Sequence, residues 1–360
     1  MSVLLAAIVI GLLLTPFIFP GAQALAVAAK ILVFIVLVAS FDLLLGYTGI
    51  ASFAHTMFFG IGAYGVAIAC TRIAPTWGAI AIGILAALAL SLVISTVIGL
   101  VSLRVRAMFY AMITLAMASA FQTLAGQLRD LTGAGDGLTF SLPRLLSPAF
   151  RLSEEPVLGV VLNGRIISYY LLFFSAVIFF LALLRIVNST FGRVLQAIRE
   201  NDFRVEAIGF RVVIYRTASN VLAALFATLA GAMFAIWLGY NGPSTTLSFE
   251  VMVNILLMLV IGGMGTMYGA IIGATLFLIA ENYLHAVMEY TSHALSNVPF
   301  LAALFSPERW LLWLGVLFVL SVYFFPSGIV GRLRESSDAK RSARMWRAPP
   351  VRAGSVENAK

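Results

Sequence analysis

Few ionisable side chains stand within or beside the long apolar stretches of this sequence. Asp42 precedes a glycine-rich passage, His55 lies within it, and Glu250 opens a later apolar run. Four others are expected to be solvated near the outer face: Glu281, His285, Glu289 and His293. A charge near the centre of a lipid bilayer costs at least about 2.5 kcal/mol, so such residues mark ion, proton or substrate pathways by default. Asp42 and His55 do not form a chain of proton relays, and a lone buried histidine is more often a hydrogen-bonded structural residue. The sequence leaves both roles of His55 open.

Glycines interrupt the apolar stretches at two places. The first passage runs from Gly46 to Gly65 and contains the spacing G-x-G-x-x-G at Gly60, Gly62 and Gly65. That spacing binds a dinucleotide only where it follows a strand in a βαβ unit, and both flanks here are apolar spans. We therefore do not expect a dinucleotide site.

The second glycine passage runs from Gly262 to Gly273, and within it Gly265, Gly269 and Gly273 repeat at four-residue intervals. Small residues at this spacing let two helices approach closely. Glycine-broken segments in the two halves of a membrane protein also point to a translocation path. Helix packing alone, and packing combined with pathway lining, both remain open.

Sequence motifs for ATP binding and catalysis are absent. The lysines are Lys30, Lys340 and Lys360, and none follows a glycine, so there is no phosphate-binding G-x-x-x-x-G-K-[ST] loop. There is also no G-x-S-x-G or H-E-x-x-H motif. A single cysteine, Cys70, excludes an intrachain disulfide, and no Cys/His cluster has metal-ligand spacing. We expect no catalytic residues, no metal and no cofactor in this chain, so active transport would draw its energy from ions or another subunit.

One long polar and charged passage, from Asn188 to Arg216, lies between two strongly apolar spans. Its apolar residues recur at i, i+3, i+4 and i+7, which predicts a short amphipathic helix with a polar face opposite. A helix of this kind covers lipid headgroups, its own helix bundle, or a groove in a soluble partner. A solvated cytoplasmic loop with no partner fits this passage equally well. The apolar residues are Phe191, Val194, Leu195 and Ile198, and the polar face carries Arg193, Gln196 and Glu200.

The composition places the chain in a membrane. It has 360 residues, of which 61% are hydrophobic and 11% charged, whereas a soluble domain is roughly 45–50% apolar and about 25% charged. The formal net charge is +8, but the basic residues gather in the polar passage and in the tail after Phe325. That is the positive-inside pattern of membrane proteins, so no nucleic-acid partner is implied.

Because a bilayer core needs about 20 apolar residues per helix, the sequence predicts an all-α polytopic membrane protein with about ten transmembrane or re-entrant helices. The first segment lacks a basic n-region, so we expect a retained helix rather than a cleaved signal peptide. The short third and eighth spans fit re-entrant segments equally well. The expected spans are Met1–Pro20, Ala26–Gly46, Ala54–Thr71, Gly78–Leu103, Ala107–Leu128, Ile166–Val187, Tyr215–Leu238, Glu250–Ile261, Ala270–Met288 and Trp310–Phe325.

Charge predicts the orientation. With the N-terminus inside, ten crossings place the polar passage, the Arg104/Arg106 turn and the C-terminus in the cytoplasm, and those regions hold most of the arginines. We therefore expect residues 1–326 to form the membrane domain with both termini inside. Residues 129–165 would form an outer, periplasmic loop, residues 188–214 a cytoplasmic loop, and residues 327–360 a basic, disordered cytoplasmic tail.

Several passages, taken in order, resemble the LivM-type permease of branched-chain amino-acid ABC transporters, in the hydrophobic amino-acid uptake family. Each block is short, but they are collinear over about residues 40 to 330. The blocks are Phe41–Gly49, Ser52–His55, Phe58–Tyr64, Arg104–Leu115, Leu131–Leu138, Phe191–Asn201, Glu206–Gly209, Gly262–Thr266 with Gly269, and Phe325–Gly328.

The sequence departs from the family pattern at three positions. Asp42 stands where the family usually has Asn, Asn254 where an acid is common, and Ala270 where Pro is usual. These departures affect path-facing details more than the fold. Relatives that carry urea or short amides share most of the blocks, so urea or short amides are an alternative substrate class. An ion-coupled secondary transporter is an alternative to the ABC importer.

The resemblance implies a multi-pass permease subunit in the bacterial inner membrane. Two permeases, here a heterodimer with a shorter LivH-type subunit, would form the path. Two cytoplasmic ABC ATPases would bind ATP and Mg²⁺, and a periplasmic or lipid-anchored binding protein would deliver the amino acid.

Within that scheme the polar passage is the coupling helix, which docks in a groove of the ATPase by its apolar face and sets its register through polar contacts. The expected coupling residues are Phe191, Gly192, Arg193, Leu195, Ala197, Ile198, Arg199, Glu200, Glu206, Ala207 and Gly209. The expected path residues are Asp42, Gly46, Tyr47, Gly49, Ser52, His55, Gly60, Gly62, Gly262, Gly263, Gly265 and Gly269.

Overall fold

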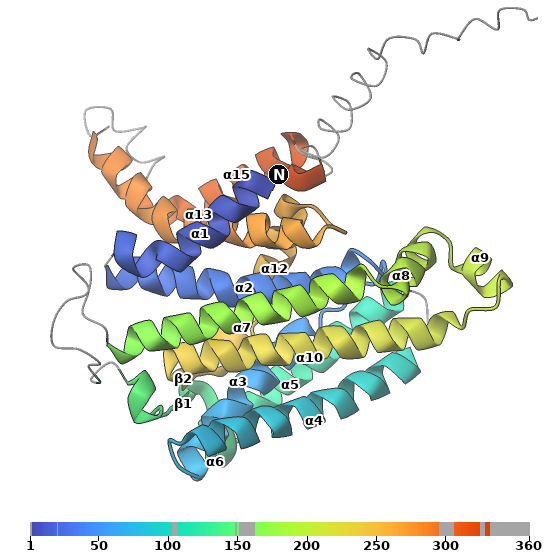
Figure 1. Ribbon diagram of the computed structural model, residues 1–360. Coiled ribbons are helices and arrows are strands. Elements are labelled where there is room, and N and C mark those ends of the chain that lie inside the picture. The colour runs from blue at the N-terminus through green and yellow to red at the C-terminus, as the bar shows by residue number, and fades with distance from the viewer. Residues whose placement is uncertain are drawn as a thin grey trace, which may run out of the picture.

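The computed structural model describes residues 2–19, 21–102, 107–147, 150, 163–294, 306–324 and 328–331. In these ranges the chain is a bundle of long helices (Figure 1). The long helices are α1 (Ser2–Ile18), α2 (Ala22–Leu45), α3 (His55–Arg72), α4 (Trp77–Ser102), α5 (Ala107–Gln127), α7 (Gly164–Val187), α10 (Val212–Leu238), α12 (Phe249–Gly262), α13 (Met267–Ala294) and α15 (Trp310–Phe324).

Short elements lie between the long helices. They are α6 (Arg129–Thr132), α8 (Thr190–Glu200), α9 (Asp202–Ala207), α11 (Pro243–Thr246), the two-residue strands β1 (Leu138–Thr139) and β2 (Tyr240–Asn241), and the 3₁₀ turns η1 (Ala134–Asp136), η2 (Arg144–Leu146) and η3 (Pro307–Arg309). Figure 1 shows α6, β1 and β2 at one end of the bundle and α8 and α9 at the other.

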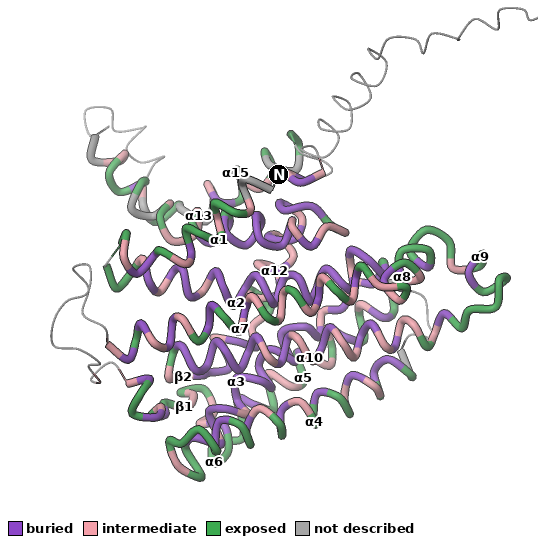
Figure 2. The backbone as a smooth tube through the Cα atoms, in the orientation of Figure 1, coloured by how far each residue is buried: buried purple, intermediate pink, exposed green. Residues whose placement is uncertain are grey.

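The helix α2 lies at the centre of the bundle. It is apolar around its whole circumference, which is the pattern of a helix buried on every side, and it packs against α7, α10, α12 and α13. Most of its residues are buried, as Figure 2 shows. By contrast, α4 and α5 expose large apolar side chains such as Leu85, Phe109 and Met112. Since soluble proteins rarely expose contiguous apolar faces of this size, we assign these faces to lipid.

Seven helical segments of the described chain are long and apolar enough to cross a membrane: α2, α4, α5, α7, α10, α11 with α12, and α13. Each of the ten expected spans corresponds to a helix, but α1, α3 and α15 are not among these seven. The polytopic, mostly helical membrane class is confirmed. The helix α12 has 14 residues, a rise of about 21 Å, so α11 must extend it to match a bilayer core of about 30 Å.

The expected outer loop, residues 129–165, contains more structure than the sequence predicts. Besides α6, η1 and η2, it contributes β1, which pairs antiparallel with β2 through Leu138–Asn241 and Thr139–Tyr240. This small ladder joins the loop to the end of α10 and is the one departure from an all-α fold among the described residues. Residues 148–149 and 151–162 of the loop lie outside the described residues.

Two other expectations concern residues at the edge of the described chain. Arg104 and Arg106 lie outside it, as do residues 332–360 of the expected tail. The start of that tail is packed: a Cβ atom on Gly328 would lie 2.2 Å from Gly263 Cα, and Val330 is buried. The packed chain therefore extends beyond residue 326 to at least Gly331.

Glycines let α3 cross α10 with their backbones in contact. A Cβ atom on Gly62 would lie 1.8 Å from Thr228 O, and one on Gly231 would lie 1.8 Å from Phe59 O. The backbones of α12 and α13 are also in close contact at a glycine, since a Cβ atom on Gly273 would lie 1.9 Å from Met258 O. Close backbone approach is the main use of small residues in membrane helices.

An ion pair joins α2 to α13. Lys30 Nζ lies 3.0 Å from Glu281 Oε2, and both side chains are largely buried, with 31% and 19% of their surface exposed. Lys30 Nζ also lies 5.8 Å from the centroid of the Phe34 ring. The sequence predicted a solvated Glu281 near the outer face and no role for Lys30, because local patterns do not link residues that are 251 positions apart.

We predict that Gly62→Ala lowers the stability of the purified protein by about 1–3 kcal/mol, because its methyl group has no room against the α10 backbone. The matched control is Gly126→Ala in α5, where a Cβ atom would meet nothing within 4 Å. That control should be neutral or slightly stabilising, since alanine is more favourable than glycine in the interior of a helix. Thermal unfolding in detergent measures both, and equal effects would contradict the close crossing of α3 and α10.

We predict that the double variant Lys30→Met/Glu281→Gln loses less stability than the sum of the losses of the two single variants. The difference, which is the interaction energy of the pair, should be about 1–3 kcal/mol. Each single change leaves the other charge unpaired in a largely buried position, which is costlier than losing both. A double-mutant cycle on unfolding midpoints gives the interaction energy directly. Strict additivity would show that the two side chains do not pair.

Candidate coupling and translocation site

The polar passage between α7 and α10 folds into two short helices, α8 and α9, as Figure 1 shows. Gly192 permits the tight turn after α7, because a Cβ atom there would lie 2.0 Å from Val187 O. Asn201 caps α9 by accepting a hydrogen bond from Arg204 N at 3.0 Å. Arg216 Nη2 then pairs with Asp202 Oδ2 at 3.3 Å. These contacts hold α8 and α9 in a defined position at the end of the bundle.

The amphipathic helix predicted from the sequence is present, but its apolar face is turned inward. Leu195 and Ile198 are 0% and 2% exposed, and the Phe191 ring stacks on Tyr215 at a centroid distance of 5.8 Å. The expectation that this face grips a partner is therefore corrected, since the chain's own bundle covers it. The apolar stripe showed that one face of α8 must be covered. Periodicity alone does not tell whether the chain's own bundle or another protein covers that face.

The outward side of α8 and α9 is polar with apolar additions. It carries six of the expected coupling residues, which are exposed: Arg193, Ala197, Glu200, Glu206, Ala207 and Gly209. Arg199 is exposed as well, but its side chain lies against Gly49 and Gly265 rather than on this outward side. The sequence pattern did not indicate Phe203 and Ile208, which are 81% and 72% exposed. Helix α9 has only six residues, too few to show a periodic pattern that would have marked them.

The end of α2 carries the first group of expected path residues. After Leu45 the chain turns through Gly46, Tyr47 and Thr48, and Gly49 adopts a φ of +76°. Ile50 N donates to Leu44 O at 3.1 Å. Thr48 Oγ1 donates to Leu43 O and contacts Ser219 Oγ of α10, each at 2.9 Å.

The turn between α12 and α13 carries the second group. Gly263 and Gly265 adopt φ values of +112° and +81°, which an L side chain rarely tolerates. Gly265 N donates to Asp42 Oδ1 at 2.8 Å. Asp42 is 0% exposed, and its Oδ2 atom has no hydrogen-bond partner among the described residues. The Asp42 carboxylate therefore joins α2 to this turn.

Arg199 connects the two groups to α8. Its Nη1 atom donates a hydrogen bond to Gly46 O, and its side chain lies against both Gly49 and Gly265. The structure thus brings the coupling helix and the residues Asp42, Gly46, Gly49, Gly263 and Gly265 together at one end of the bundle. The sequence predicted both sets but did not predict that they touch.

Other expected path residues lie in the interior of the bundle. His55 Nε2 is 2.8 Å from Ser40 Oγ, and its ring lies 5.2 Å from the Phe41 ring, which is the environment of a buried structural histidine. Ser52 is buried as well. Gly60, Gly62, Gly262 and Gly269 all lie at close contacts, with Leu247, Thr228, Gly269 and Gly263 respectively. For these four glycines helix packing is the visible role.

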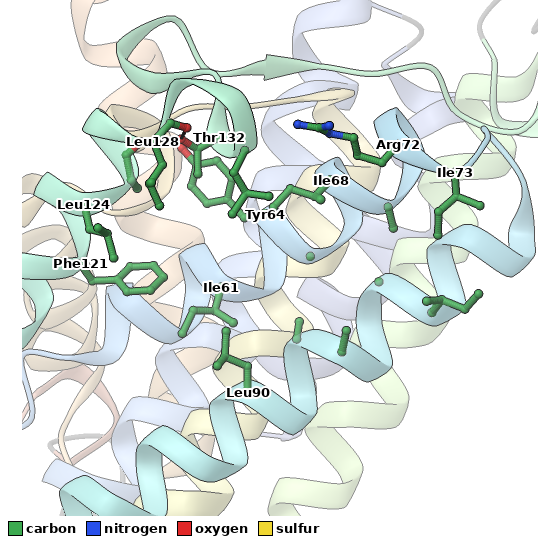
Figure 3. Close-up of a pocket in the computed structure, with 18 residues that line it drawn as sticks. Ile61, Tyr64, Ile68, Arg72, Ile73, Leu90, Phe121, Leu124, Leu128 and Thr132 are labelled. Carbon is green, nitrogen blue, oxygen red and sulfur yellow. Dashed lines mark hydrogen bonds between the residues drawn. The ribbon is translucent and has the colours of Figure 1, made fainter.

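A largely apolar cavity of about 470 Å³ lies between α3, α4, α5 and α6 (Figure 3). Arg72 stands at its rim and donates a hydrogen bond to Asp130 O. Tyr64 is buried, and its hydroxyl has no hydrogen-bond partner among the described residues. None of the expected coupling or path residues lines this cavity, so it is separate from the site at the α8 end.

Comparison with known proteins agrees with this architecture. The family described as branched-chain amino acid transport system / permease component matches residues 23–322. The high-affinity branched-chain amino acid transport system permease protein LivM of Salmonella typhimurium is 24% identical over 298 residues, covering 78% of this chain and 68% of the relative. The protein of the same name from Escherichia coli is 24% identical over 304 residues, again covering 78% and 68%.

A third similar protein matches a smaller part of the chain. The probable branched-chain amino acid transport permease protein LivM of Methanocaldococcus jannaschii is 25% identical over 197 residues, covering 53% of this chain and 54% of the relative. No solved structure matches. Because the family match spans most of the sequence, this chain belongs to the permease component family of branched-chain amino acid transport systems.

Proposed function

We propose that this permease subunit carries branched-chain or other hydrophobic amino acids across the bacterial inner membrane as part of an ABC importer. The observation that carries the proposal is the α8–α9 unit, which projects from one end of the bundle and contacts two broken helix ends there. Family membership and the names of the relatives support the substrate class. The energy would come from ATP and Mg²⁺ bound to partner ATPases.

The docking surface for an ATPase would be the outward side of α8 and α9. Arg193, Glu200 and Glu206 offer charges of both signs for register, while Phe203 and Ile208 offer exposed apolar area. Buried aromatic anchors surrounded by polar contacts are typical of the centre and rim of an interface. Leu195 and Ile198 would act from below, by fixing α8 to its own bundle.

The orientation follows from the same assignment. The end with α8 and α9 would face the cytoplasm, and the end with α6, β1 and β2 would face the periplasm and receive the binding protein. A second, LivH-type permease would complete the path together with the broken ends of α2 and α12. Gly49 is exposed at this point and Gly265 is half-buried, so both are available to line an aqueous opening.

We predict that Phe203→Asp greatly reduces co-purification of the ATPases from native membranes, because it places a charge in the apolar part of the proposed interface. The matched control is Leu145→Asp, an exposed apolar residue (45%) at the opposite end of the bundle. That variant should retain the ATPases. Quantitative mass spectrometry of the affinity-purified chain measures both.

Full retention of ATPases by Phe203→Asp would remove α9 from the docking surface. A wild-type chain that purifies without any ATPase would contradict the importer proposal and favour transport driven by an ion gradient. Uptake of labelled leucine, competed by urea or by valine, would then decide the substrate class in the reconstituted transporter.

A further inference from the structure

We propose that Arg199 transmits the movement of α8 to the broken ends of α2 and α12, and so couples the docked ATPase to the opening of the membrane path. The inference rests on the proposed function, because it presupposes that an ATPase moves α8. It adds the specific residue through which that movement reaches the membrane segments.

The first support is the fit of the Arg199 side chain between three glycines. A Cβ atom on Gly49 would lie 3.1 Å from Arg199 Cγ, and one on Gly265 would lie 2.8 Å from Arg199 Nη1. The Gly46 carbonyl accepts a hydrogen bond from the guanidinium. Any larger residue at Gly49 or Gly265 would press on the arginine.

The second support is the position of α8 relative to its neighbours. Helix α8 packs mainly on α7, α9 and α10. Arg199 reaches away from these contacts to segments that lie 153 residues earlier in the chain, at Gly46, and 66 residues later, at Gly265. It therefore links α8 to both glycine passages, through a hydrogen bond to Gly46 O and through close packing against Gly265.

The third support is the kind of backbone that Arg199 contacts. Gly49 and Gly265 both have positive φ values, and glycine moves between backbone conformations at lower cost than other residues. Beyond Gly265 lies the buried Asp42 carboxylate, which accepts a hydrogen bond from Gly265 N. A shift of the guanidinium would thus act on two flexible joints, one of which the carboxylate holds to α2.

Arginine suits this position better than lysine. Its guanidinium keeps its charge and presents five N–H donors in a rigid plane, so it can hold the Gly46 carbonyl while it lies against Gly265. The single ammonium group of lysine would keep the charge but would donate hydrogen bonds to fewer acceptors at once. Arg199→Lys should therefore retain part of the function that Arg199→Ala loses.

The test uses the complete transporter in lipid vesicles: this chain, the second permease, the ATPases and the binding protein, with labelled leucine as the probe. The variants are Arg199→Ala, Arg199→Lys and Gly265→Ala. The control is Arg185→Ala, because Arg185 is exposed near the end of α7 and has no part in the proposed docking surface or path. Each complex is measured for ATPase content, leucine uptake and ATP hydrolysed per leucine transported.

We expect Arg199→Ala to retain the ATPases while uptake falls about tenfold or more, as for loss of a hydrogen bond to a charged group, with ATP hydrolysis continuing. Gly265→Ala should show the same uncoupling, Arg199→Lys should recover part of the uptake, and Arg185→Ala should behave as wild type. The rise in ATP hydrolysed per leucine is the readout that a merely structural role would not produce.

Three outcomes would overturn the inference. Normal uptake by Arg199→Ala would show that the link is not needed, loss of ATPases would place Arg199 in docking instead, and a parallel fall of uptake and hydrolysis would indicate a structural role. A wild-type chain that binds no ATPase would overturn the proposed function itself. The co-purification measurement thus separates failure of the inference from failure of the proposal on which it rests.

Discussion

The carbonyl groups at the end of α2 must find hydrogen-bond donors inside the protein, and the rest of the site depends on how they do so. A backbone polar group that is buried away from water and unpaired is costly, so helix ends within a membrane protein need partners from neighbouring segments. Here Thr48 Oγ1 donates a hydrogen bond to Leu43 O, and Ile50 N donates one to Leu44 O. Arg199 donates a hydrogen bond to Gly46 O. The last donor comes from the polar passage, which ties a surface loop to the end of the central helix α2.

This arrangement explains why α8 packs on its own chain. The helix must hold Arg199 against Gly46, and the buried Leu195 and Ile198 fix it there. Its opposite side, extended by α9, remains exposed for a partner. Glycines serve two physical purposes in the same bundle: at Gly62 and Gly273 they allow backbones to touch, whereas at Gly49 and Gly265 they allow left-handed turns. The first kind lets the helices of the bundle pack closely, and the second kind lets the chain turn sharply at its end.

Much of this could be predicted from the sequence, because apolar length and charge asymmetry are local signals. The helices near residues 22–45 and 164–187 and the amphipathic α8 follow from run length and periodicity. Contacts between distant residues could not be predicted from these patterns. The Lys30–Glu281 pair, the ladder of β1 with β2, and the Arg199 contact to Gly46 each join segments far apart in the chain. The burial of Leu195 against its own bundle was not predicted for the same reason. An apolar stripe on a helix shows that something covers it, but not which segment or protein does so.

The central claim, that α8 lies on the broken end of α2, can be tested most directly by disulfide formation between positions 49 and 199. A Cβ atom on Gly49 would lie 3.7 Å from Arg199 Cβ, within the range of about 3.5–4.5 Å that a disulfide requires. The measurement uses Gly49→Cys with Arg199→Cys in a chain whose one cysteine is removed by Cys70→Ser, oxidised in native membranes. The account predicts rapid, near-complete cross-linking, with none when Glu206→Cys replaces Arg199→Cys. Absence of the cross-link, with free labelling of position 199 by aqueous thiol reagents, would contradict it.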